Sequence, residues 1–297
     1  AHPWERLTCH LLCPWASSMV TVSTMARSSS SRDISFDTDF GPARIRWDGP
    51  RATLFLGDVE SSAVDTSDPT YLEFEYMQHM DAVVSSLWGP QDRFRALHVG
   101  GAACALACAW SSSHPQSRHV AVEVDRLLAE QVREHFPIPK APQVKIRVGD
   151  GRAVLDGTRE GSFDVIVRDA FASGMTPDHL RTVECADQVR RALTASGVYL
   201  VNCAHGGPAN ARQDVAALQD VFPFVASIQD PKVGRGGRRG NVVALASAAD
   251  VVDVDQIDRA LRMLALPARI TRPAELTRWV AGTPTLTDAQ VGYPQAD

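Results

Sequence analysis

Four short apolar runs of the chain each end in a glycine or an acid, residue types that can bind a nucleoside. The runs follow one another at intervals of roughly twenty to thirty residues, which is typical of parallel strands joined by crossover helices. In an open parallel sheet, ligands bind at the carboxyl ends of the strands. The sequence therefore predicts one ligand-binding edge, formed by Gly100, Gly101, Glu123, Asp150, Gly151 and Asp169.

The first three runs provide groups that suit the adenosine part of a ligand. Gly100 and Gly101 let the backbone of a strand-to-helix turn come close to the ligand, where the helix N-terminus favours polar or anionic groups. Glu123, roughly twenty residues further on, can accept hydrogen bonds from both ribose hydroxyls. Asp150 can accept one from the exocyclic amine of adenine, and Gly151 leaves room for the ring. A tight turn without ligand, an exposed acid and a helix N-cap are the simpler alternatives.

Asp169 ends the fourth run, a very apolar one, and we expect it to face the reacting end of the ligand. A carboxylate at this place can hold a substrate ammonium group or act as a base toward an amine. The alternative interpretation is a solvated strand end. His205, which follows the fifth predicted strand, is a further candidate for substrate contact.

Other polar residues near these runs receive structural interpretations. Asp125 is predicted to cap the helix that follows the second strand, and His98 lies on a core strand. Cys104 stands where such loops prefer glycine or threonine. Cys104 and Cys108 are one helical turn apart, but no other metal-ligating residue is near them in the sequence, so no metal is expected.

Strands and helices alternate from residue 91 onward and must position these residues. The predicted strands are 95–99, 119–124, 144–148, 163–168, 198–202, 223–229 and 241–247. The predicted helices are 103–111, 125–136, 151–156, 178–195, 208–221 and 254–266. Right-handed crossovers join the first five strands, and the short Gly-rich segment between the last two requires an antiparallel hairpin. This pattern predicts an α/β, Rossmann-like methyltransferase fold with a seven-stranded mixed sheet whose last strand is antiparallel.

A small β module is predicted to precede this sheet. Two strands flank the turn signal Asp48-Gly49-Pro50, a second turn follows at Gly57-Asp58, and a helix over 71–88 links the module to the rest. Met19 and Met25 are candidate natural start residues. The predicted division is a mostly disordered segment at 1–34, the β module and linking helix at 35–90, and the nucleoside-binding catalytic domain at 91–297.

Composition narrows the class of partner. The chain has 297 residues and a formal net charge of −5, which gives no general attraction to nucleic acid or to an anionic membrane. No apolar stretch approaches the roughly 20 residues that span a bilayer. The six cysteines include no Cys-x-x-Cys pair, which is typical of reduced thiols in the cytoplasm. We therefore expect a cytoplasmic protein with a small-molecule substrate and without nucleic-acid or membrane partners.

Together these motifs resemble the spermidine synthase (polyamine aminopropyltransferase) family, in its bacterial spermidine-synthase-like branch. The resemblance extends from about residue 40 to 290. It is carried by the segments 54–62 and 68–80, 98–103, 122–125, 148–152, 169–171 and 176–184, and 197–202. The segment around 169–184 is similar to the family's gate loop, and 197–202 to its fifth strand.

The resemblance implies that the chain binds decarboxylated S-adenosylmethionine, S-adenosylmethionine or methylthioadenosine, without a metal. In this family the enzyme orients a polyamine amine for in-line attack on the aminopropyl carbon, and carboxylates hold the cationic ends of the acceptor. Gly100, Gly101, Glu123, Asp150 and Gly151 would then contact the nucleoside. Asp169 would lie near the reacting amine. The family also implies a homodimer.

The chain departs from the family pattern at three places. Ala172 stands where the gate loop carries a second acid after Asp169, Ser61 replaces a cofactor-contacting glutamine, and Glu75-Tyr76 replaces a His-Glu pair. A diamine carries two positive charges, so the loss of acidic partners weakens its binding. An aminopropyltransferase-like enzyme is therefore the leading hypothesis. An S-adenosylmethionine-dependent methyltransferase and a catalytically silent nucleoside-binding or interaction protein are the alternatives.

Overall fold

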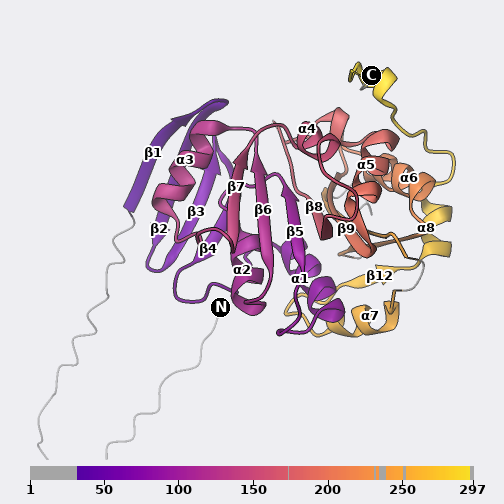
Figure 1. The fold of residues 1–297 in the computed structure, drawn as a ribbon, viewed down its shortest axis with the longest axis horizontal. Helices are drawn as coiled ribbons and strands as arrows, with labels where there is room; N and C mark the ends of the chain where they lie inside the picture. Colours follow the sequence, from indigo (N-terminus) through magenta and orange to yellow (C-terminus); the bar gives the residue numbers. More distant parts are fainter. Residues whose placement is uncertain (1–31, 173, 231, 234–238, 250–251, 295–297) are drawn as a thin grey trace, which may run out of the picture.

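The structure, a computed structural model, describes residues 32–172, 174–230, 232–233, 239–249 and 252–294. Within these residues a four-stranded antiparallel sheet precedes a mixed sheet of eight strands, and helices cover the larger sheet (Figure 1). The predicted α/β class with a small N-terminal β module is confirmed.

The small sheet is a simple meander. Its strands are β1 (Arg32–Thr38), β2 (Gly41–Asp48), β3 (Arg51–Leu56) and β4 (Val59–Asp65). Gly49 and Gly57 have φ values of +57° and +58°, as tight hairpin turns require. The disordered segment predicted at 1–34 is wrong for its last three residues, because Arg32 and its neighbours pair with β2. The rest of that segment lies outside the described residues.

The large sheet has the order β12-β10-β11-β9-β8-β5-β6-β7. Its strands are β5 (Arg95–Val99), β6 (Arg118–Glu123), β7 (Val144–Val148), β8 (Phe163–Arg168), β9 (Leu193–His205), β10 (Phe224–Gln229), β11 (Gly240–Ser247) and β12 (Arg269–Thr271). The five neighbouring strands β9, β8, β5, β6 and β7 pair in parallel, whereas β11 is antiparallel to both β9 and β10. The seven predicted strands and the closing hairpin are thus present, and β12 adds an eighth strand on the edge beside β10.

Helices follow most strands of the large sheet. They are α1 (Glu75–Leu87), α2 (Ala105–Ser113), α3 (Arg126–His135), α4 (Gly151–Asp156), the 3-10 helix η1 (Asp178–Leu180), α5 (Val183–Ala192), α6 (Ala211–Val221), α7 (Val254–Arg262), α8 (Pro273–Val280) and α9 (Asp288–Val291). The single helix predicted over 178–195 is wrong. Thr182 caps α5 by accepting a hydrogen bond from Cys185 N, and residues from Leu193 onward pair as β9 with β8.

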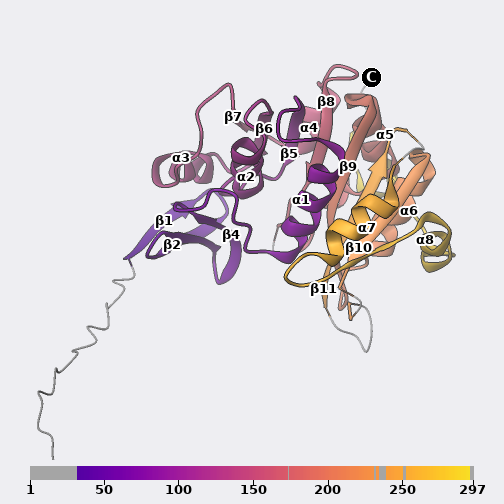
Figure 2. The same cartoon turned by 90° about the horizontal axis from the view of Figure 1, so that it is seen from below.

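Both faces of the large sheet are covered, which explains why β5 and β8 are buried over most of their length. Met80 of α1, Trp110 of α2 and Ile257 of α7 belong to the core on one face, and Figure 2 shows α1 and α7 along the same side. Val189 of α5 and Val215 of α6 belong to the core on the other face.

The small sheet packs beside α2 and α3 rather than standing apart. Leu54 of β3 shares a hydrophobic cluster with Ala107 of α2 and Leu128 of α3. The division of the chain at residue 90 stays a prediction. Within the described part of the chain, no helix has both the length and the apolar character needed to cross a membrane.

Candidate functional site

Backbone hydrogen bonds bring the ends of β5, β6 and β8 together at one edge. Gly100 N donates to Val122 O at 3.1 Å, and Asp169 N donates to Val99 O at 2.8 Å. Gly100 has a φ of +94°, and a Cβ atom on it would lie 2.2 Å from Asp169 O. Only glycine allows the backbone at position 100 to come this close to Asp169. The pairing of β5 with β8 therefore requires glycine at this position.

The loop after β5 keeps a glycine-like shape although its later positions are not glycine. Ala102 has a φ of +37° and Cys104 a φ of +57°, which costs each residue on the order of 1–2 kcal/mol. Strained backbone of this kind collects at ligand-binding sites. The loop therefore adopts a left-handed backbone conformation at Cys104, although cysteine stands where such loops prefer glycine or threonine.

Glu123 holds this loop in place. Its Oε2 accepts hydrogen bonds from Ala102 N at 2.9 Å and Gly101 N at 3.3 Å, and its Oε1 accepts one from Asp125 N at 3.1 Å. Each carboxylate oxygen has two acceptor positions, so one position on Oε1 remains for a ribose hydroxyl. The structure brings Gly100, Gly101 and Glu123 together, and their contact with a nucleoside stays a prediction.

Asp150 caps α4 and also meets a residue of the loop after β8. Its Oδ1 accepts a hydrogen bond from Ala153 N at 2.9 Å, and His179 Nε2 lies 3.0 Å from its Oδ2. The hydrogen bond with His179 and the backbone N–H groups lower the pKa of Asp150. The side chain is 40% exposed, so this carboxylate remains accessible to a ligand.

Gly151 has a packing role that the sequence does not reveal. A Cβ atom at this position would lie 2.4 Å from Val99 Cγ1 and 3.7 Å from Leu180 Cδ2. Because α4 packs closely against β5, position 151 must lack a side chain. A role for Gly151 beside an adenine ring stays a prediction.

Asp169 is held by two neutral donors at the end of β8. Tyr76 Oη donates to its Oδ2 at 2.8 Å and Asn202 Nδ2 donates to its Oδ1 at 2.8 Å. Asn202 in turn accepts a hydrogen bond from Asn241 Nδ2 at 2.7 Å. Burial raises the pKa of Asp169, and the two hydrogen bonds oppose that rise. This carboxylate is an oriented group rather than a solvated strand end.

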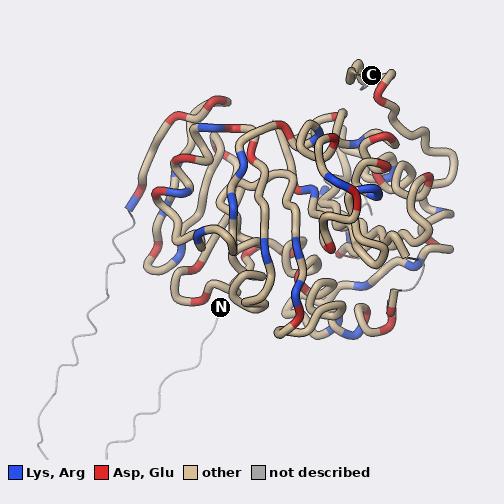
Figure 3. Tube along the Cα trace, viewed as in Figure 1, with Lys and Arg blue, Asp and Glu red and all other residues tan. Residues whose placement is uncertain are grey.

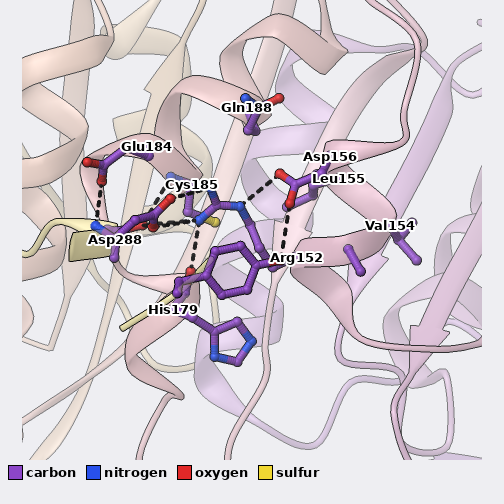
Figure 4. Close-up of polar contacts among 12 residues, drawn as sticks. Arg152, Val154, Leu155, Asp156, His179, Glu184, Cys185, Gln188 and Asp288 are labelled. Atoms are coloured by element: carbon purple, nitrogen blue, oxygen red, sulfur yellow. Dashed lines mark hydrogen bonds and ion pairs between the residues drawn. The ribbon is translucent and has the colours of Figure 1, made fainter. Parts of the chain in front are cut away.

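The C-terminal part of the chain supports the edge near Asp150. The Arg152 guanidinium forms two hydrogen bonds with the Asp288 carboxylate, at 2.9 and 2.7 Å, and a third with Asp156 at 2.9 Å (Figure 4). The Tyr293 ring stacks on His179 with 5.6 Å between centroids and an interplanar angle of 4°. Residues far apart in the sequence thus fix the position of His179 beside Asp150.

No family model matches the chain. Among curated proteins, the polyamine aminopropyltransferase of Vibrio vulnificus (strain CMCP6) is 26% identical over 110 residues, which are 36% of this chain and 37% of that protein. The chain therefore matches little more than a third of that relative's length. A probable spermidine synthase from Corynebacterium glutamicum ATCC 13032 is 31% identical, with a TM-score of 0.79 over 86% of this chain and 96% of that chain. The chain belongs to the spermidine synthase family.

The fold of this family member is shared more widely. Human methyltransferase-like protein 13, solved in complex with SAH, is 20% identical with a TM-score of 0.52, over 64% of this chain and 94% of that chain. At this identity the likeness concerns the fold alone.

The contacts of three site residues in this spermidine synthase family member are not predicted from the sequence. Tyr76 stands out in the sequence only in the pair that replaces the family's His-Glu pair, and helical spacing alone accounts for a tyrosine on the apolar face of α1, so its hydrogen bond to Asp169 is not expected. Asn202 carries a weak signal, since it is a buried amide that follows the apolar stretch Val198–Val201 of β9. His179 lies in a loop whose contact with Asp150 no local pattern predicts.

The remaining polar candidates have structural roles. Asp125 caps α3 by accepting a hydrogen bond from Leu128 N at 2.8 Å, as predicted. His98 is buried, with its Nε2 3.1 Å from Nδ1 of His119. His205 accepts a hydrogen bond from Ala211 N at 3.3 Å at the start of α6. Within the described residues, no three His, Cys, Asp or Glu side chains are grouped to hold a metal.

Proposed function

We propose that this chain is a transferase that binds an adenosylmethionine-type nucleoside at the carboxyl ends of β5, β6, β7 and β8. The proposed reaction is transfer of an aminopropyl group from decarboxylated S-adenosylmethionine to an amine of a polyamine. The relatives support this direction, since one is named a polyamine aminopropyltransferase and another a probable spermidine synthase. We expect the enzyme to be a cytoplasmic homodimer.

The observation that carries the proposal is the environment of Asp169. Tyr76 and Asn202 orient its carboxylate but are both neutral, so they do not cancel its charge. In a partly buried site, an ionised carboxylate attracts a cation more strongly than it would in water. The cationic or amine end of an acceptor is the natural complement to this group.

The proposed chemistry needs little from the protein beyond orientation. The amine nitrogen forms a bond to the aminopropyl carbon, the bond from that carbon to the sulfonium sulfur breaks, and its electron pair stays on sulfur as methylthioadenosine. The secondary ammonium ion formed in this step then loses a proton to solvent or to Asp169. Glu123 and Asp150 would hold the ribose and adenine at the other end of the site.

Methyl transfer from S-adenosylmethionine is the second candidate, and one observation favours it. Ala172 gives the gate-loop segment no second carboxylate, so the distal ammonium of a diamine lacks that partner. A methyl acceptor with one amine does not need it. A protein that binds the nucleoside without catalysis is the remaining alternative.

A thermal-shift experiment with decarboxylated S-adenosylmethionine, S-adenosylmethionine and methylthioadenosine tests the proposal first. Ligand at 100 times its dissociation constant stabilises the folded state by about 2.7 kcal/mol, equivalent to a Tm rise of roughly 5–10 °C for a domain of this size. Absence of a shift with all three would exclude both enzymatic functions.

Turnover then separates the two reactions. Product formed from putrescine and decarboxylated S-adenosylmethionine supports aminopropyl transfer, whereas turnover only with S-adenosylmethionine supports methyl transfer. Asp169→Asn should reduce turnover by at least about tenfold while nucleoside binding persists. Asp187→Asn, at an exposed position of α5, is the matched control and should leave turnover unchanged.

A further inference from the structure

A hollow lies at the opposite end of the large sheet from the candidate site. It has a volume of about 410 Å³ and is lined by residues that include Arg93, Arg95, Gln116, Arg118 and Asp164. Arg95 begins β5, Arg118 begins β6, and Asp164 is the second residue of β8. The hollow is therefore formed at the amino ends of three adjacent strands, and its volume lies within the usual range for small-molecule sites.

The sheet register forces two of these arginines together. Arg95 and Arg118 are direct partners on the first rung between β5 and β6. Neighbouring residues on one rung of a sheet point to the same face, and like charges there repel each other. Figure 3 shows basic positions at the amino ends of β5 and β6 and acidic positions near the opposite edge of the sheet.

Neutral acceptors hold the guanidinium groups while leaving donors free. Arg93 Nε donates to Gln116 Oε1 at 2.7 Å, and Arg118 Nη1 donates to Ser117 O at 2.7 Å. Arg95 Nη2 donates to Gly161 O at 3.3 Å. Within the described residues, none of the three guanidinium groups forms an ion pair with a carboxylate. Three positive charges thus line one hollow without forming an ion pair in the described part of the chain.

The carboxylate in the wall is already engaged elsewhere. Asp164 Oδ2 accepts a hydrogen bond from the backbone N–H of Arg95 at 2.8 Å, and its Oδ1 accepts one from Thr194 Oγ1 at 3.1 Å. It therefore serves the backbone at the start of β5 and a side chain at the start of β9. The net charge facing the hollow remains positive.

We propose that this hollow binds a small molecule that carries a diphosphate or longer oligophosphate group. Guanidinium groups match phosphate oxygens with paired hydrogen bonds, and one multiply charged anion can offset several arginines at once. The overall charge of −5 argues against a nucleic-acid backbone as the partner. The inference does not depend on the proposed function, since the hollow lies at the amino ends of the strands and the candidate site lies at their carboxyl ends.

Isothermal titration calorimetry of the full chain with pyrophosphate at low ionic strength tests the inference. We expect saturable binding that Arg95→Gln or Arg118→Gln weakens by at least about tenfold each, because each removes charge-assisted hydrogen bonds. Arg269→Gln is the matched control, since it removes the same charge from an exposed position on β12 of the same sheet. It should leave binding unchanged.

Further ligands define the class. Uridine diphosphate binding with the same variant profile would indicate the phosphate tail of a nucleotide, whereas binding of pyrophosphate alone would indicate a free oligophosphate. Equal affinity for citrate would overturn the phosphate assignment. Absence of saturable binding up to about 10 mM pyrophosphate, or equal affinity in the wild type and both hollow variants, would overturn the site itself. Circular dichroism of each variant verifies that loss of binding does not reflect loss of fold.

Discussion

Breaking the buried ion pair between Arg152 and Asp288 by removing one partner should cost far more stability than breaking an exposed pair. Arg152 Nη2 lies 2.7 Å from Asp288 Oδ2, and both side chains are 4% exposed. Arg126 Nη1 lies 2.6 Å from Glu130 Oε1, but these side chains are 56% and 57% exposed. The two pairs differ in burial and in the number of hydrogen bonds that the arginine makes, and the second serves as the exposed reference for the first.

Arg152→Met leaves the Asp288 carboxylate buried without its cationic partner. Removing one member of a buried pair costs about 3–5 kcal/mol in the free energy of unfolding, whereas Arg126→Met should cost about 0.3–0.5 kcal/mol. Thr182 Oγ1 donates to Asp288 at 2.6 Å, and we expect this hydrogen bond to persist in the variant, which favours the lower end of the first range. The double variant Arg152→Met/Asp288→Leu removes both charges and should recover most of the loss.

Urea unfolding at neutral pH, followed by circular dichroism, measures these differences. Limited proteolysis should also cleave the C-terminal segment faster in Arg152→Met, because α9 loses its main attachment to α4. If Arg152→Met and Arg126→Met differ by less than about 1 kcal/mol, burial does not govern this pair as reasoned. A double variant no more stable than Arg152→Met would refute the unpaired-charge explanation specifically.

Three further predictions concern the candidate site and the core. Tyr76→Phe removes one hydrogen bond from Asp169 and should lower kcat/KM of the proposed reaction by roughly 10- to 100-fold, with little change in Tm; unchanged kinetics would contradict the orienting role. Gly100→Ala places a Cβ atom 2.2 Å from a backbone oxygen at a φ of +94°, whereas at Gly101 the nearest contact is 3.6 Å. Urea unfolding should therefore show a loss of at least about 2 kcal/mol for the first variant and less than about 1 for Gly101→Ala, and equal losses would refute the steric argument. Burial lowers the pKa of His98 to about 3, so its unfolded form binds more protons, and stability should fall as pH decreases from about 6.5 toward 3. Urea unfolding across this range should show that the free energy of unfolding depends less steeply on pH in His98→Gln than in the wild type. An identical dependence would contradict the conclusion that His98 causes the loss of stability.

The parallel strands of the large sheet could be predicted from the sequence almost residue by residue. β5, β7 and β8 have the predicted bounds, because each is a short apolar run closed by glycine or acid. Such runs are local signals that the surrounding fold does not override. The hairpin of β10 and β11 follows from a connection too short for a crossover helix.

The features that the sequence could not predict depend on contacts between distant residues. β12 has only three residues and exists through its pairing with β10, so no periodicity marks it. Arg152 and Asp288 are 136 positions apart, and nothing local distinguishes them from a solvated helix arginine and an N-terminal helix acid. The reason for glycine at position 151 is likewise distant, since it is the Val99 side chain that excludes a Cβ atom.

The three strand-end acids differ in what holds them, and this determines what each can contribute to binding. Glu123 accepts backbone N–H groups of its own loop, so much of its capacity maintains the loop. Asp150 is partly exposed and meets His179, which places it in a solvated environment of high dielectric. Asp169 has neutral side-chain donors, and burial raises its pKa more than these donors and the charge of Arg168 lower it, so its charge is costly to maintain. An arriving amine relieves that cost, and binding of a cationic acceptor and ionisation of Asp169 should therefore reinforce each other.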